Sequence, residues 1–164
     1  MNILEIVVSD FFFSTGWGAV FNTVKMEPEK SVAVFGLGAL GLSVIQAAKK
    51  AGATDIVGVD LNESKFEIAK ELGGTSFVNP SKSNDGGKGD LLKDHKWGYD
   101  YTFDCTGNVN VMRCALEVAH RGWGESCIIG VAAAGKEIST RPFQLGTISH
   151  KMSTTNYYCH YITQ

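Results

Sequence analysis

Residues 32–41, which read VAVFGLGALG, constrain the fold of this chain more than any other segment. They place glycines at 36, 38 and 41 directly after an apolar stretch that is typical of a buried strand. A Gly-x-Gly-x-x-Gly triplet either forms a loop that binds phosphates or lets a helix pack close to a strand. Because 19 of the 164 residues are glycine, chance matches are common and the triplet alone does not decide between the two.

The rest of the chain alternates strand-like and helix-like segments. Apolar, β-branched runs predict strands at residues 31–35, 55–59, 77–79, 99–104 and 125–131. Helical spacing of apolar residues predicts helices at 40–51, 63–72, 91–96 and 109–120. Residues 81–89 (SKSNDGGKG) are expected to form a polar loop with nothing to bury. This order predicts one α/β domain with a doubly wound parallel sheet, the Rossmann fold, and puts the glycine triplet at the first crossover.

The position of each glycine favours the phosphate-binding interpretation. Gly36 lies where the strand must turn, Gly38 leaves no Cβ between the backbone and a phosphate, and Gly41 allows the helix to approach the sheet. The free N–H groups of Ala39 and Leu40 would then face the phosphates at the positive end of the helix dipole.

Asp60 adds a second signal, because it ends the next expected strand about 20 residues after Gly41. A carboxylate at this spacing is typical of one that binds the 2′-hydroxyl of an adenosine ribose. Since a carboxylate repels a 2′-phosphate, the interpretation is NAD rather than NADP. The alternative is that Asp60 caps a helix beginning at Leu61 or Asn62. Lys65 is either a solvated helix charge or a second group for the same ribose.

Methyltransferases with a Rossmann fold are an alternative to dinucleotide-binding proteins. They also combine a glycine turn with an acidic residue after the second strand. Their glycine pattern is looser than the one in this chain, and nothing later in the sequence resembles their motifs. The pattern therefore favours a dinucleotide.

The composition argues against several other classes of protein. Fifteen Lys and Arg against 17 Asp and Glu provide no basic excess for nucleic acid or an anionic membrane. The apolar runs are too short to span a bilayer, and no secretory signal pattern opens the chain. The cysteines at 105, 114, 127 and 159 form no CxxC motif, which favours free thiols in a cytoplasmic protein.

Five longer segments carry a further signal. They read FSTGWGAVFNTVKMEP, VAVFGLGALGLSVI, GVDLNESKFEIAKELG, CTGNVNVMRCALEVAHRGWG and GVAAAGKEISTRPFQL. Together they closely resemble the coenzyme-binding domain of the zinc-dependent medium-chain alcohol dehydrogenases. The last two are similar in particular to class III, the glutathione-dependent formaldehyde dehydrogenases or S-nitrosoglutathione reductases. The resemblance covers residues 14–145 and weakens across 81–96.

This resemblance implies a set of residues that bind NAD. They are Gly36, Gly38, Ala39, Leu40 and Gly41 for the pyrophosphate, Asp60 and Lys65 for the adenosine ribose, Leu61 and Thr106 for the adenine, and Thr15, Gly130 and Val131 for the nicotinamide.

The resemblance also bears on the catalytic zinc of the family. Two of its three protein ligands lie in an N-terminal catalytic domain, which no segment of this chain resembles. The third is a cysteine three residues before the STG motif, and here that position is Phe11. Phenylalanine supplies no thiolate, and a catalytic zinc needs three protein ligands. We therefore expect no catalytic residue and no zinc site in these residues.

Both ends of the chain depart from the family pattern. This divides the sequence into a divergent segment 1–13, an NAD-binding domain 14–145 and a divergent tail 146–164. Within the tail, residues 154–162 either pair with the sheet as an edge strand or fray.

Three functions remain open from the sequence. The first is the family activity, NAD-dependent oxidation of S-hydroxymethylglutathione and alcohols. The second is NAD binding without turnover, which we expect of these residues alone. The third is a non-catalytic fragment that self-associates or pairs with an intact relative through the edge of the sheet.

Overall fold

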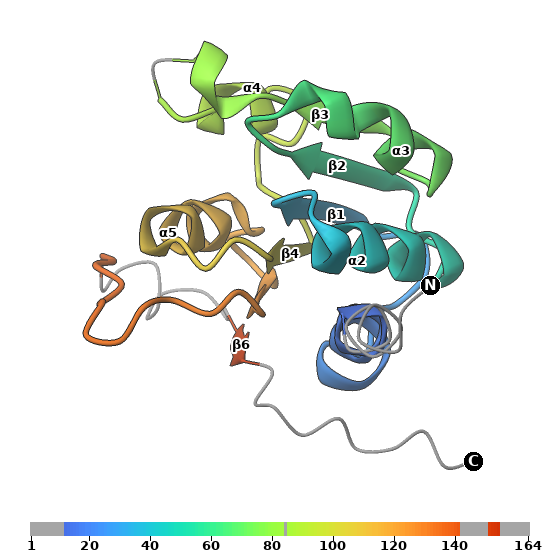
Figure 1. Cartoon of the computed structure of the whole chain (residues 1–164), viewed down its shortest axis with the longest axis horizontal. Helices are drawn as coiled ribbons and strands as arrows, with labels where there is room; N and C mark the ends of the chain where they lie inside the picture. The colour runs from blue at the N-terminus through green and yellow to red at the C-terminus, as the bar shows by residue number, and fades with distance from the viewer. Residues whose placement is uncertain (1–11, 84, 142–150, 155–164) are drawn as a thin grey trace, which may run out of the picture.

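The computed structural model describes residues 12–83, 85–141 and 151–154. In this part of the chain a six-stranded sheet has the order β3-β2-β1-β4-β5-β6, with every neighbouring pair parallel (Figure 1). The strands are β1 (Ser31–Phe35), β2 (Asp55–Val59), β3 (Ser76–Val78), β4 (Tyr101–Asp104), β5 (Glu125–Ile128) and β6 (Lys151–Thr154). The strand order reverses between β1 and β4, because successive strands are added on one side of β1 up to β3 and on its other side from β4 onward. Doubly wound folds bind their ligands at this point. The predicted fold class is confirmed.

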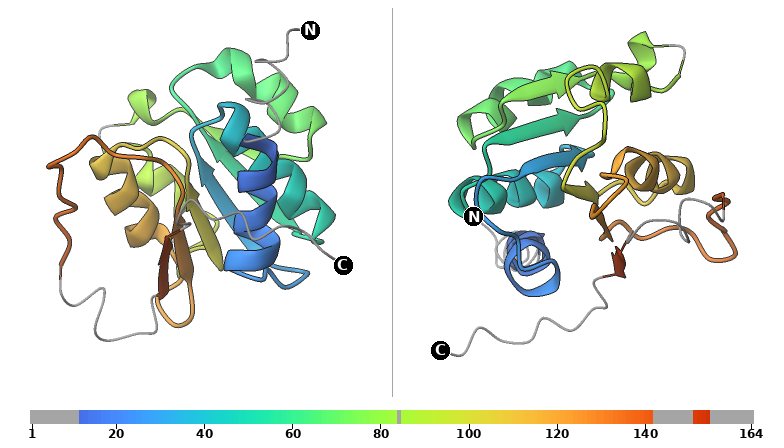
Figure 2. Two further views of the ribbon diagram at one scale, coloured as in Figure 1. Left: turned by 60° about the horizontal axis from the view of Figure 1, so that its bottom comes forward. Right: turned by 180° about the vertical axis from the view of Figure 1, so that it is seen from behind.

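Helices cover both faces of the sheet (Figure 2). One face carries α2 (Ala39–Lys50), α3 (Phe66–Glu71) and a helical segment of residues 12–18 that continues into the π-helical turn η1 (Ala19–Thr23). The other face carries α4 (Lys88–Leu91) and α5 (Val109–Val118). Successive residues of β1, such as Val34 and Phe35, are buried against opposite faces. A strand covered on both sides has no polar face, so its sequence is a continuous apolar run.

The predicted strands agree with the structure except at their ends. β1 and β2 have the predicted bounds, and β3 lies one residue earlier. β4 begins later than predicted because Tyr99 makes only an isolated bridge to Ala119. β5 ends at Ile128 because the amides of Ile129 and Gly130 both donate to the carbonyl of Asp104, which stops the ladder.

The predicted helices are confirmed for α2 and α5 and divided at 63–72. There the chain forms a 3₁₀ turn, η2 (Glu63–Lys65), before α3 begins. The Asn62 side chain accepts a hydrogen bond from the amide of Ser64, a local cap that replaces the first α-helical turn.

Residues 81–96 differ most from the prediction. The predicted loop contains part of η3 (Pro80–Lys82) and the start of α4, while the predicted helix at 91–96 is wrong because α4 ends at Leu91. The carboxylate of Asp85 accepts hydrogen bonds from the amides of Gly87 and Gly89. This side-chain cap starts the helix before the apolar residues begin, so an apolar pattern does not reveal it.

β6 forms one edge of the sheet and lies in the segment that the sequence analysis separated as a tail. It pairs with β5 in parallel, with Glu125 opposite Lys151 and Ile128 opposite Thr154. Of the candidate edge strand at 154–162, only Thr154 belongs to β6, and residues 155–162 lie outside the described residues.

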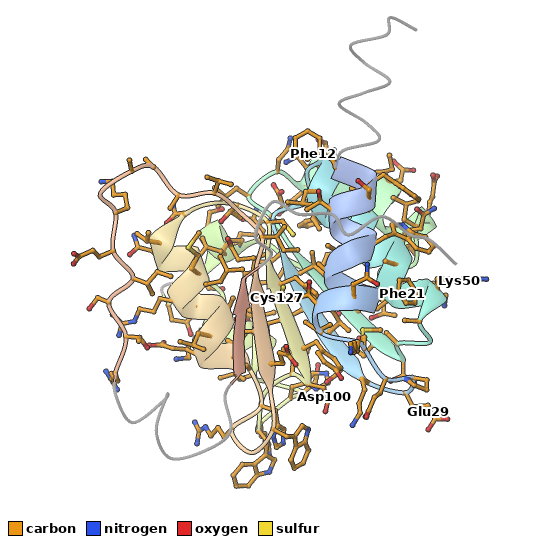
Figure 3. The ribbon with its side chains drawn as sticks, turned by 90° about the horizontal axis from the view of Figure 1, so that it is seen from below. Phe12, Phe21, Glu29, Lys50, Asp100 and Cys127 are labelled. Atoms are coloured by element: carbon orange, nitrogen blue, oxygen red, sulfur yellow. The ribbon has the colours of Figure 1, made fainter. Side chains whose placement is uncertain are left out.

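The N-terminal helical segment packs closely on α2. The Ser43 hydroxyl donates to the carbonyls of Phe12 and Phe13 at 3.1 and 3.2 Å. Gly16 permits this approach, since a Cβ there would lie 1.9 Å from the Ser43 oxygen. Figure 3 shows Phe12 at the end of the molecule opposite Asp100, which precedes β4, so the segment starts near the carboxyl ends of the strands.

In the described part of the chain, no helix combines the length and the apolar character needed to cross a membrane.

We expect a chain shortened to residues 1–150 to melt about 2–8 °C lower than the full chain and to self-associate more. Loss of β6 leaves the N–H and C=O groups along β5 without a neighbouring strand, and such an edge recruits other chains. Thermal melts and light scattering after size exclusion measure both effects. A chain ending at residue 154, which keeps β6, is the control. Indistinguishable behaviour of the two shortened chains would contradict the prediction.

Candidate functional site

The turn after β1 is shaped by glycine. Gly36 has φ +88°, a conformation that residues with side chains rarely adopt. A Cβ at this position would also lie 2.7 Å from the Thr106 side chain, which follows β4. The Gly36 amide donates to the carbonyl of Val59 at 2.8 Å, so the turn is tied to the end of β2. The carboxyl ends of β1, β2 and β4 thus meet at Gly36.

Gly41 and Gly38 have different roles at the start of α2. A Cβ on Gly41 would lie 1.8 Å from the Gly36 carbonyl oxygen, so the helix sits directly on the turn. The predicted packing role of Gly41 is confirmed. Gly38 precedes the helix in an extended conformation, is exposed, and has no atom within 4 Å of where its Cβ would be. It therefore leaves open space in front of the helix.

The N-terminus of α2 is available to a ligand. Among the described residues no side chain caps it, and the first intrahelical bond runs from the Leu42 amide to the Gly38 carbonyl. The amides of Ala39 and Leu40 precede that bond and have no acceptor within the helix. Ala39 is exposed and Leu40 is half-buried. An uncapped start of a 12-residue helix, open to solvent, suits an anionic group.

Asp60 lies at the end of β2 and holds the glycine turn from the other side. One carboxylate oxygen accepts the Leu37 amide at 2.7 Å and the Lys65 ammonium at 3.0 Å. The other accepts the Asn62 amide at 2.8 Å. Burial alone would raise the pKa of Asp60, but these two amides and Lys65 outweigh it and lower the pKa. The side chain, 10% exposed, therefore stays charged next to the turn.

The alternative for Asp60 is also realised in part. Its bond to the Asn62 amide is a local turn cap of the kind expected at the end of a strand. The same carboxylate still faces the glycine turn through Leu37, so the capping role and a position at the site coexist.

A pocket of about 560 Å³ opens beside these groups. Four of the predicted site residues line it, namely Gly36, Asp60, Leu61 and Thr106. Sequence reasoning missed the remaining lining residues, which are Phe35, Val59, Pro80, Asp85, Gly86, Asn108, Asn110, Val111 and Cys114. Asp85 and Gly86 belong to the segment predicted to be a plain loop. Burial raises the pKa of the Cys114 thiol, so this side chain lines the pocket as a neutral group.

Asp104 is a second aspartate at the end of a strand, and it braces the opposite wall. Its carboxylate accepts the Thr106 hydroxyl at 2.6 Å and the Gly107 amide at 3.3 Å. The residue is fully buried, and burial raises the pKa of its carboxyl although these donors favour the charged form. Sequence reasoning missed it. The available signal was its position directly before the CTGN turn, which parallels that of Asp60 before its own turn.

The other predicted residues lie beside the pocket or apart from it. Lys65 reaches the site through its bond to Asp60. Gly130 and Val131 pack on the turn after β4, where a Cβ on Gly107 would lie 2.4 Å from the Val131 carbonyl oxygen. Thr15 lies in the helical segment 12–18 and is not among the residues that line the pocket.

The site has groups for binding and no recognisable metal centre. Among residues 12–83, 85–141 and 151–154, no three side chains of His, Cys, Asp or Glu are placed to hold a metal ion. Phe11, the position at which the family resemblance implies a cysteine ligand, lies outside the described residues. The arrangement combines free backbone amides, the carboxylates of Asp60 and Asp85, and a pocket that several apolar side chains line, a set that suits a nucleotide.

Comparison with known proteins gives consistent matches. A family model described as zinc-binding dehydrogenase matches residues 39–162. The S-(hydroxymethyl)glutathione dehydrogenase of Escherichia coli (strain SMS-3-5 / SECEC) is 58% identical over 134 residues, which are 82% of this chain. Among solved structures, 2R,3R-butanediol dehydrogenase from Bacillus subtilis is 32% identical, with a TM-score of 0.79 over 90% of this chain and 41% of that one. Benzyl alcohol dehydrogenase from Acinetobacter calcoaceticus is 25% identical, with a TM-score of 0.85 over 94% and 42%.

These matches confirm the resemblance found in the five sequence segments. They also set its extent, because this chain spans only 36% of the length of the Escherichia coli relative.

We expect Gly41→Ala to lower the stability of the fold and Gly38→Ala to weaken NAD binding. Gly41→Ala forces a methyl group onto the Gly36 carbonyl and lowers the free energy of unfolding by about 2–4 kcal/mol. Gly38→Ala adds a methyl group to open space and changes stability by less than about 1 kcal/mol. It nevertheless weakens NAD binding about tenfold or more, because the methyl group occupies the space in front of the helix amides. Denaturant unfolding and calorimetric titration with NAD measure the two effects. Equal destabilisation by both variants would show that Gly41 is not the contact that seats the helix.

Proposed function

We propose that this chain, which belongs to the zinc-binding dehydrogenase family, is the NAD-binding part of an S-(hydroxymethyl)glutathione dehydrogenase. The observation that carries the proposal is the position of Asp60. Its carboxylate is charged, borders the pocket and is fixed to the glycine turn through the Leu37 amide. Phosphate-binding amides and a ribose-binding carboxylate are thereby held in one rigid unit.

Separate groups of residues at the carboxyl edge of the sheet suit the pyrophosphate, the adenosine ribose and the adenine of NAD. The open amides at Ala39 and Leu40 are suited to the pyrophosphate, and Asp60 to the hydroxyl groups of the adenosine ribose. Leu61, with 69% of its surface exposed, and Thr106 stand on the pocket where the adenine would lie.

The nicotinamide end of the proposed site rests on the family resemblance. It assigns this part to Thr15 and to the backbone at Gly130 and Val131. The bound nicotinamide would supply the hydride acceptor of the reaction. The contribution of the chain itself is to orient that ring through the turn at Gly107, which Asp104 holds rigid.

We further propose that these 164 residues by themselves bind NAD without turnover. The relatives' zinc polarises the alcohol, and that role requires three protein ligands. The described residues contain no group of three His, Cys, Asp or Glu side chains placed to hold a metal ion, so they supply no set of ligands for this zinc. Substrate oxidation is then a property of the longer relatives, of which this chain matches 36%.

Asp60→Ala is expected to weaken NAD binding by roughly 10- to 100-fold and to narrow the gap between NAD and NADP. The variant removes both the ribose acceptor and the anchor of the Leu37 amide. Asp60→Asn is the matched control, because it removes the charge and keeps an acceptor for that amide. Calorimetry on the three proteins separates the two effects. Equal affinity of the unmodified chain for NAD and NADP would contradict the assignment of Asp60.

The purified 164-residue chain is expected to show no NAD-coupled oxidation of ethanol or S-hydroxymethylglutathione, with or without added zinc. Absorbance of the reduced cofactor measures the rate, and metal analysis of the same sample measures bound zinc. The Escherichia coli relative serves as the positive control. A zinc-dependent rate from this chain would overturn the proposal of binding without turnover while leaving the NAD site in place.

A further inference from the structure

The charge that Asp60 presents to the pocket is partly offset by its neighbour. The Lys65 ammonium lies 3.0 Å from the carboxylate and is 38% exposed, so solvent and a ligand can also reach it. A 2′-phosphate on the ribose would meet this ammonium as well as the carboxylate. Asp60 and Lys65 together carry no net charge, so the pair repels a 2′-phosphate less strongly than an unpaired carboxylate would.

A second carboxylate lies on the same pocket. Asp85 lines it together with Gly86, Asn110 and Cys114, all of which come from other elements than Asp60. The described residues that line the pocket include no lysine, arginine or histidine. Within the described part of the chain, none of the ion pairs involves Asp85. Its hydrogen-bond partners are the neutral amides of Gly87 and Gly89, so its charge is not neutralised.

Asp85 is also held in place. It caps α4, and α4 is fastened to α5 by Lys88, whose ammonium lies 2.6 Å from the Glu117 carboxylate. Arg113 binds the other oxygen of Glu117 at 2.9 Å, which orients that carboxylate along α5. The segment that carries Asp85 is therefore fixed against the helix that forms the neighbouring wall of the pocket.

The size of the pocket decides whether this charge matters. Asp60 and Asp85 line the same pocket, and a sphere of its volume, about 560 Å³, would be about 10 Å across, comparable with the Debye length of ~8 Å at physiological salt. A phosphate bound near Asp60 is thus within range of Asp85. Because Asp85 is exposed, water screens the interaction and the effect is modest.

We propose that Asp85 is a specificity-determining residue that selects against a 2′-phosphorylated adenosine. The inference rests on the proposed NAD-binding function and assigns part of the preference for NAD to the segment before α4. The negative charge of this second carboxylate raises the free energy of a bound phosphate dianion. It has little effect on a ribose without the phosphate, because that ribose is uncharged. Asp60 would then recognise the ribose hydroxyl groups, while Asp85 adds to the repulsion of a 2′-phosphate that Asp60, paired with Lys65, exerts.

The test compares Asp85→Asn and Asp85→Ser with the unmodified full chain. Both substitutions remove the charge and keep a side-chain oxygen that accepts from the amides at the start of α4. Asp90→Asn is the matched control, since it removes one negative charge from α4, directly after the segment that carries Asp85, and Asp90 is not among the residues that line the pocket. Calorimetry measures the affinities for NAD and NADP and, to isolate the adenosine end, for 5′-AMP and adenosine 2′,5′-bisphosphate.

The expected result is a shift of about 3- to 10-fold in the affinity ratio toward the phosphorylated ligands in both Asp85 variants, with little change in Asp90→Asn. The shift should shrink as salt rises from about 0.05 to about 0.5 M. Unchanged ratios, or the same shift in Asp90→Asn, would overturn the role of Asp85 and leave the proposed NAD site standing. Failure of the unmodified chain to bind NAD or 5′-AMP would overturn the proposed function itself, and this inference with it.

Discussion

The contact between the first turn of α2 and the Gly36 carbonyl is the constraint on which the rest of the site depends. A Cβ added at position 41 would lie only 1.8 Å from the Gly36 carbonyl oxygen, so α2 can rest on the turn only if residue 41 is glycine. That contact sets the direction of the helix, and the direction decides where its open amides point. The same turn is tied to β2 through Val59 and packs on Thr106 after β4, so three strand ends take their relative positions from one peptide unit.

Asp60 shows why structural and binding interpretations of one residue need not compete. Its carboxylate caps the turn at Asn62, fixes the Leu37 amide and pairs with Lys65. Each of these bonds favours the charged form, which is why the pKa of Asp60 falls although burial opposes it. A carboxylate that is fixed and charged before any ligand arrives loses little freedom on binding one. The bonds that stabilise the fold thus prepare the group that we propose binds the ribose.

Much of the fold follows from local sequence, and much of the pocket does not. β1 and β2 were predicted to the residue because each is a buried apolar run ended by a residue that breaks it, Gly36 or Asp60. α4 was misplaced because Asp85 starts it through side-chain caps before any apolar residue appears. The pocket wall at Asp85 and Cys114 depends on α4 packing against α5, a contact between segments far apart in the sequence. The division between residues 14–145 and the tail stays a prediction from the sequence. β6 lies within that tail.

Asp60 follows β2 and Asp104 ends β4, the two strands on either side of β1, and their surroundings distinguish the two aspartates. Asp104 is fully buried, its pKa is raised by burial, and its donors are the groups of its own turn. Asp60 retains exposure, its pKa is lowered, and it borders the pocket. A buried, internally satisfied carboxylate stiffens a wall, whereas a charged one at the surface of a pocket can exchange water for a ligand hydroxyl. Spacing along the chain identifies both as strand-end aspartates. Burial and charge are the reasons why we propose the binding role for Asp60 and a bracing role for Asp104. In the described part of the chain, therefore, the groups that we propose bind NAD come from one edge of the sheet and from the backbone.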